Sequence, residues 1–178
     1  MPTSDQRQFL VNVADLRRRL GNQRRVELRL TSPGWALQSA AVGEGEPVEV
    51  TLDLEAVSGG VTAVGTLGAT WRGECRRCLE EVEGRLDLAL DEVFEDSPTE
   101  GETYPTDGDL IDLAPMLRDA VLLALPLAPL CGEDCPGPAP GRFEVEITAD
   151  DASDDASQAR DPRWAALDAL REGGGSAN

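Results

Sequence analysis

Four cysteines in two short pairs are the residues of this 178-residue chain with the clearest capacity for chemistry. Cys75 and Cys78 form a C-R-R-C pattern, and Cys131 and Cys135 form C-G-E-D-C. Thiolates at such spacings converge on one metal ion, and four of them complete the tetrahedron that structural zinc prefers. The pattern therefore predicts a structural zinc site with these four ligands, which would join segments 52 residues apart.

Other interpretations of the cysteines remain open. Iron also accepts four thiolates, and four reduced cysteines can lie buried without any metal. A redox pair at Cys75 and Cys78 is a further alternative. A redox C-x-x-C normally opens a helix whose N-terminus lowers the thiol pKa, whereas this pair lies between two predicted strands.

The residues that are missing exclude several classes of enzyme. The chain has no histidine and no lysine, so it has no Ser-His-Asp triad, no Schiff-base lysine and no phosphate-binding loop of the G-x₄-G-K-[ST] kind. Nothing in the sequence selects a catalytic pair among its carboxylates. We expect a protein that is not an enzyme; the catalytic alternatives are a thiol redox enzyme and a catalytic zinc with three thiolates and a water.

The charge is strongly negative and unevenly distributed. The net charge is −18, yet residues 1–30 hold seven arginines and three acids, whereas residues 79–112 hold 13 acids and one arginine. The acidic body repels nucleic acid and favours basic partners. The N-terminal patch offers candidate phosphate contacts for nucleic acid, namely Arg17, Arg18, Arg19, Arg24 and Arg25. The alternative is that these arginines clamp onto the acidic body of the same chain.

The sequence also indicates where the protein works. No segment approaches the roughly 18 apolar residues of a membrane span, and the first residues lack the apolar core of a signal peptide. We therefore expect a cytoplasmic protein, in which the thiols stay reduced and a disulfide framework does not form.

Alternation of apolar and polar residues predicts strands over 26–30, 48–54 and 82–94, and a run rich in β-branched residues predicts a fourth over 61–72. The first cysteine pair then lies in the turn of a hairpin between the last two strands. Gly65 and Gly68 are predicted to form β-bulges.

Two helices are predicted from other sequence signals, namely the helical spacing of apolar residues and the residues that end or cap a helix. Residues 14–20 predict a brief helix that Gly21 closes, and residues 113–124 predict a buried helix with Asp112 as its N-cap. The predicted fold class is α+β: an antiparallel, β-rich single domain with one buried helix and a short C-terminal helix.

The chain is predicted to divide into four parts. Residues 1–148 form the domain with both cysteine pairs, and residues 149–160 form an acidic disordered linker. Residues 161–171 form a short docking helix, and residues 172–178 form a flexible tail.

Several motifs together resemble one bacterial family. They are G-E-C-R-R-C-L-E at the hairpin tip, the long stretch from D-G-D-L-I-D-L-A-P-M-L-R-D-A-V-L-L to P-L-C-G-E-D-C-P-G, the terminal D-P-R-W-A-A-L-D-A-L, and the early V-A-D-L-R-R-R-L-G. The combination resembles the YceD family, the large ribosomal RNA subunit accumulation proteins. Many of its members continue the second pair with C-P-x-C-G, where this chain has Pro-Ala-Pro-Gly at residues 138–141.

The resemblance implies a cytoplasmic, non-catalytic ribosome-biogenesis factor that supports synthesis, processing or accumulation of 23S ribosomal RNA. Its implied partners are pre-ribosomal RNA or large-subunit assembly intermediates, with no membrane and no small-molecule substrate. An alternative is an acidic protein-binding module that shields a basic ribosomal protein through residues 79–112.

Overall fold

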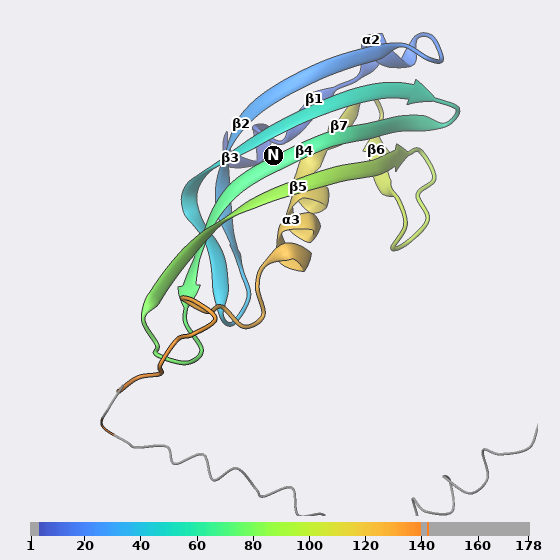
Figure 1. Cartoon of the computed structure of the whole chain (residues 1–178). Coiled ribbons are helices and arrows are strands. Elements are labelled where there is room, and N and C mark those ends of the chain that lie inside the picture. The colour runs from blue at the N-terminus through green and yellow to red at the C-terminus, as the bar shows by residue number, and fades with distance from the viewer. Residues whose placement is uncertain (1–3, 140–141, 143–178) are drawn as a thin grey trace, which may run out of the picture. The chain divides into compact units, whose positions relative to one another are not determined.

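One seven-stranded sheet and a twelve-residue helix form the framework of the computed structural model, which describes residues 4–139 and 142 (Figure 1). The sheet order is β1-β7-β6-β5-β4-β3-β2. The elements in chain order are α1 (Ser4–Arg7), β1 (Leu10–Asn12), α2 (Ala14–Arg17), β2 (Gln23–Ala36), β3 (Ala40–Val57), β4 (Gly60–Glu74), β5 (Glu81–Glu95), β6 (Tyr104–Asp107), β7 (Leu110–Asp112) and α3 (Leu113–Ala124).

The four long strands β2 to β5 form an antiparallel meander. Their alternation buries one face, and β3 alone contributes Val48, Val50, Leu52 and Leu54 to the core. The four predicted strands are confirmed, and each is longer than its apolar alternation indicated. The hairpin is confirmed as well, because the first cysteine pair lies in the turn between β4 and β5.

The sheet is mixed, so the prediction of an antiparallel sheet is wrong at one pair of strands. β6 runs parallel to β5, with Phe94 opposite Tyr104, in a segment for which no strand was predicted. The rings of Phe94 and Tyr104 lie with centroids 5.6 Å apart. Loop residues 96–103 bring the chain back alongside the end of β5, and this aromatic contact fixes the parallel pairing there.

Gly65 and Gly68 do not form bulges, because the pairing of β4 with both neighbours continues through them without a shift. Register shifts occur instead between Thr31 and Pro33 and between Ala41 and Val48. The glycine at position 65 serves close approach of the strands. A Cβ there would lie 1.9 Å from the carbonyl oxygen of Thr51.

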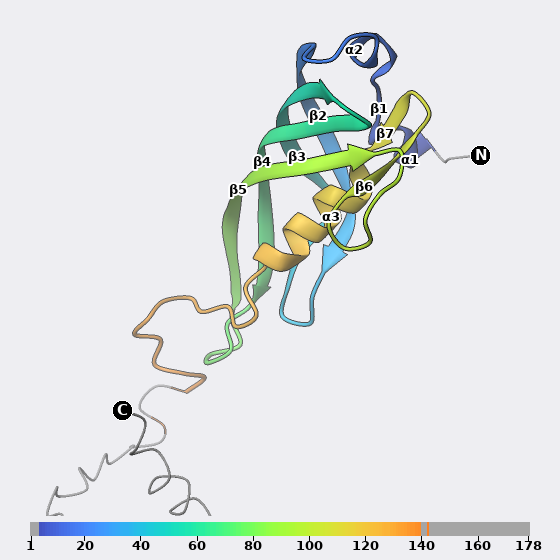
Figure 2. The same ribbon diagram turned by 90° about the vertical axis from the view of Figure 1, so that its right-hand side faces the viewer.

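The predicted buried helix is confirmed with its bounds. Asp112 caps α3 by accepting a hydrogen bond from the Ala114 amide at 2.9 Å, and Pro126 follows the last turn. The helix buries Leu113, Met116, Leu117 and Val121 against the inner face of the curved sheet (Figures 1 and 2). The other predicted helix is shorter than expected, since α2 covers only Ala14–Arg17 before the chain turns at Gly21, whose φ is +78°.

Side chains bridge the two ends of the sheet, β1 and β2. The side chain of Gln8 accepts at Oε1 from the Thr31 backbone N–H at 2.8 Å, and its Nε2 donates to the Thr31 carbonyl at 3.2 Å. Arg24 of β2 donates to the Asn12 carbonyl of β1 at 2.6 Å. The sheet thus curls almost onto itself without a backbone ladder between its ends.

The predicted linker (149–160), C-terminal helix (161–171) and tail (172–178) lie outside the described residues, so these divisions stay predictions. In the part of the chain that the structure describes, none of the helices has the length and apolar run that a membrane crossing needs.

Candidate metal centre

The turn between β4 and β5 positions the first cysteine pair, Cys75 and Cys78. The Cys75 amide donates to the Glu80 carbonyl at 2.8 Å, and the Leu79 amide donates to the Cys75 carbonyl at 2.9 Å. Leu79 closes the turn with a left-handed backbone, at a φ of +65°. These bonds hold residues 75–80 in a tight knuckle, in which the two sulfurs lie within 4.8 Å of each other.

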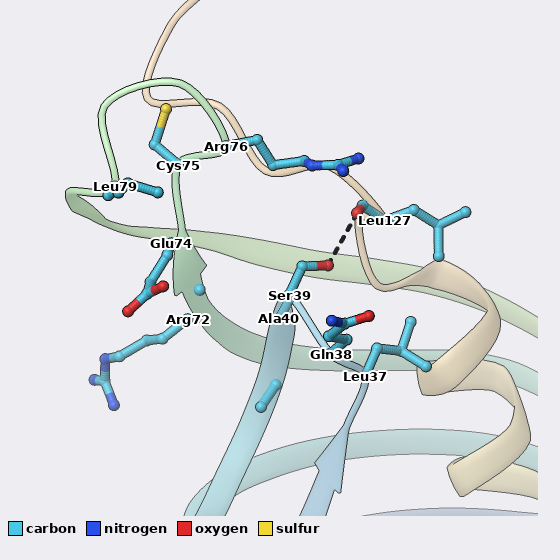
Figure 3. Close-up of a pocket in the computed structure, with 12 residues that line it drawn as sticks. Leu37, Gln38, Ser39, Ala40, Arg72, Glu74, Cys75, Arg76, Leu79 and Leu127 are labelled. Carbon is cyan, nitrogen blue, oxygen red and sulfur yellow. Dashed lines mark hydrogen bonds between the residues drawn. The ribbon is translucent and has the colours of Figure 1, made fainter. Parts of the chain in front are cut away.

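The segment after α3 brings the second pair to this knuckle. The Ser39 hydroxyl donates to the carbonyls of Pro126 and Leu127 at 3.2 and 3.0 Å, and Figure 3 shows the second of these bonds. The Arg76 amide then donates to the Pro129 carbonyl at 2.9 Å. The role of Ser39 was not predicted, because no motif in the sequence around residue 39 indicates a hydrogen-bond partner 87 residues away.

A guanidinium links the two cysteine pairs directly. Arg77, inside the C-R-R-C motif, donates from Nη1 to the Glu133 carbonyl at 2.6 Å. This bond ties the first knuckle to the backbone between Cys131 and Cys135. An arginine therefore supports the centre without being a ligand.

The structure brings together all four cysteines that the sequence singled out. The Sγ atoms of Cys75 and Cys135 lie 3.7 Å apart, as do those of Cys78 and Cys131, and all four lie within 4.8 Å of one another. A tetrahedron with metal–sulfur bonds near 2.3 Å has edges of about 3.8 Å. The cluster can therefore hold a metal ion, and its sulfur separations are too long for disulfides.

The surroundings of the sulfurs favour thiolate at one position. Backbone amides of Cys78, Arg77 and Cys131 lower the pKa of the Cys75 thiol to about 6. The thiols of Cys135, Cys78 and Cys75 raise the pKa of Cys131 to about 12. Four thiolates this close repel one another, and a divalent cation is the species that would offset that repulsion.

The centre stands at one end of the sheet and beside a cavity. Cys75 is buried and Cys131 is exposed. A cavity of about 770 Å³ opens next to Cys75, between the β2–β3 turn and the knuckle (Figure 3). The four cysteines thus lie on two segments of the chain and are not part of the hydrophobic cluster under α3.

The predicted phosphate-binding arginines are largely engaged inside the chain. Arg17 donates to Asp96 and to the Gly108 carbonyl, both at 2.5 Å. Arg25 pairs with Glu27 and Asp53, Arg18 pairs with Asp15, and Arg24 reaches β1. Among the described residues, no acid pairs with Arg19. Only the Arg17–Asp96 and Arg25–Asp53 pairs agree with a clamp onto the acidic body, and phosphate binding by the arginines stays a prediction.

The Arg17–Asp96 ion pair should make the free energy of unfolding depend on pH. A hydrogen bond from Thr106 and the nearby Arg17 hold the pKa of Asp96 below its ordinary value. A carboxyl whose folded-state pKa is depressed stabilises the fold above its unfolded pKa of about 4, and the stabilisation is lost as the pH falls through the lower folded value. We expect the wild type to be more stable than Asp96→Asn at pH 7, and the difference to shrink as the pH falls below about 4.

Urea unfolding at a series of pH values measures this difference. Asp87→Asn is the matched control, because Asp87 is an exposed β5 acid that pairs with Arg85 and lies away from Arg17. A gap between wild type and Asp96→Asn that stays constant from pH 7 to pH 3 would contradict the assignment.

Fold and site together define a class: a mixed, curled β-sheet protein whose hairpin tip and post-helix segment are joined by a centre of four cysteines. The family described as Large ribosomal RNA subunit accumulation protein YceD matches residues 63–171, which include both cysteine pairs. The chain belongs to the YceD family.

Its relatives among curated proteins are mycobacterial. An uncharacterized protein of Mycobacterium tuberculosis and one of Mycobacterium bovis are each 36% identical to it over 165 residues, which cover 88% of this chain and 78% of theirs. An uncharacterized protein of Mycobacterium leprae is 34% identical over 123 residues, 63% of this chain and 56% of its own. No solved structure matches the chain.

Proposed function

We propose that this protein is a non-catalytic, cytoplasmic ribosome-biogenesis factor that supports the accumulation of 23S ribosomal RNA. The family match carries the proposal, because it spans the β4–β5 hairpin, α3 and both cysteine pairs. The role is one of supporting assembly of the large subunit, and no bond of the RNA is made or broken by this chain.

We propose zinc as the metal and a structural role for it. Four protein thiolates fill a tetrahedron and leave no position for a substrate or a catalytic water. The chain has no histidine that could serve as a general base near neutral pH. The two cysteine pairs supply the four ligands for one ion. The bound ion would hold the segment after α3 against the β4–β5 hairpin.

The contact with assembling subunits is proposed to run through protein. The Arg17 and Arg25 side chains pair with acids of the same chain, and residues 31–178 carry a net negative charge that phosphates oppose. A basic partner protein, by contrast, is attracted to this surface.

Deletion of the gene tests the function. We expect the ratio of 23S to 16S ribosomal RNA to fall and precursors of the large subunit to accumulate, with recovery when the wild-type gene is restored. Unchanged 23S levels and unchanged subunit profiles in the deletion strain would refute the proposal.

Affinity capture before and after nuclease treatment tests the mode of contact. Ribosomal proteins that stay bound after digestion support protein contact. Complete release of partners by nuclease, together with loss of binding in a variant whose five patch arginines are replaced by glutamine, would assign the contact to RNA.

A further inference from the structure

A groove lies at the opposite end of β5 from the metal centre. Its volume is about 560 Å³, and it runs between the loop that leads into β6 and the last turns of α3. The side chains that define it are Glu92, Glu102, Tyr104, Asp119, Leu122 and Leu123. None of them belongs to the cysteine cluster or to the arginine patch.

The groove has an apolar side that solvent reaches. Leu123 is 89% exposed although it lies in the middle of the last turns of α3. Leu122 is half-buried and packs against the core, and so does Tyr104. Leu123 therefore presents a large apolar surface that nothing in the described part of the chain covers.

The other side of the groove is acidic and short of counter-charges. Within residues 4–139 and 142, Asp119 has a single cation beside it, Arg118 at 3.3 Å, and neither Glu92 nor Glu102 forms an ion pair. Burial, together with the negative charges of Asp91 and Asp119, raises the pKa of Glu92. A cation placed between these carboxylates would relieve the repulsion.

We propose that this groove binds an arginine-bearing segment of a basic partner protein. The aliphatic part of an arginine side chain packs on Leu122 and Leu123, while its guanidinium meets Glu92 and Asp119. Three carboxylates repel the phosphates of RNA from the same place. The inference rests on the proposed function, in which the partner is a basic protein of the assembling large subunit.

A labelled peptide in which four arginines alternate with leucines tests the groove. We expect the triple variant Glu92→Gln, Glu102→Gln, Asp119→Asn to bind it at least about tenfold more weakly than the wild type, and Leu123→Ser to weaken it as well. Affinity should fall as salt rises. Replacing each arginine of the peptide by citrulline, which keeps the shape and removes the charge, should abolish binding.

The matched control has the same change in net charge elsewhere. Glu44→Gln, Glu80→Gln, Glu81→Gln alters three exposed acids away from the groove and should bind within about twofold of the wild type. Equal weakening in both triple variants, equal binding of the citrulline peptide, or no binding by the wild type would each overturn the proposal. Since none of the substituted acids belongs to the buried core, unfolding measurements should show both triple variants folded.

Complementation separates this inference from the function on which it rests. If deletion lowers 23S ribosomal RNA and the groove variant restores it fully, the function stands and the groove assignment falls. If deletion leaves 23S unchanged while the peptide binds as expected, the groove stands and the function falls.

Discussion

Replacing Cys131 by serine is expected to remove the metal and to lower the unfolding midpoint by about 10 °C. The substitution deletes one of four ligands at an exposed position, so little packing is lost with it. A link that closes a loop of this length contributes about 4 kcal/mol through loop entropy. For a chain of this size each kcal/mol corresponds to about 2–4 °C.

Metal analysis and thermal unfolding check this result together. The wild type should carry one zinc per chain, and Cys131→Ser and Cys75→Ser should carry none. A chelator should bring the wild type down to the variant's midpoint and leave the variant unchanged. Wild-type protein with no metal and four thiols that titrate in the folded state would contradict the metal centre.

Gly65→Ala is expected to destabilise the fold by about 3 kcal/mol or more. The added Cβ would lie 1.9 Å from the Thr51 carbonyl oxygen and 2.9 Å from the Leu52 Cα, both backbone atoms of β3. β4 is paired on both sides at this residue, so it cannot move away without breaking a ladder. Denaturant unfolding at neutral pH measures the loss.

Gly132→Ala is the matched control for this prediction. A Cβ at position 132 would have no atom within 4 Å, and its backbone is not left-handed. We expect its free energy of unfolding to stay within about 0.5 kcal/mol of the wild type. Equal stability of the two alanine variants would show that β3 and β4 adjust to the extra carbon.

The sequence predicts those elements that have a clear periodicity of apolar residues or a specific local motif, such as a helix cap or a cysteine turn. Helix α3 and its N-cap at Asp112 were predicted correctly from the spacing of apolar residues. The cysteine hairpin was predicted because two strand-like runs flank a short polar turn. The meeting of the two cysteine pairs could be predicted from residue type. Which sulfurs are neighbours could not, because Cys75 lies next to Cys135 through the docking of the segment after α3.

The features that sequence reasoning missed are short or distant in sequence. β1 and β7 have three residues each, too few for a period, and pair across about 100 positions of the chain. The parallel β5–β6 pair depends on a ring contact between Phe94 and Tyr104. The role of Gly65 was mistaken because close strand approach and a bulge both call for glycine.

The Gln8 amide that bonds both backbone groups of Thr31 has a consequence for behaviour at high concentration. β2 is the last strand of the sheet, and an open strand of this length invites edge-to-edge aggregation with another chain. Gln8 occupies the place where an incoming strand would start its ladder. Arg25, Glu27 and Arg29 add alternating charges along the rest of the edge, and we expect these side chains together to hinder pairing of β2 with another chain.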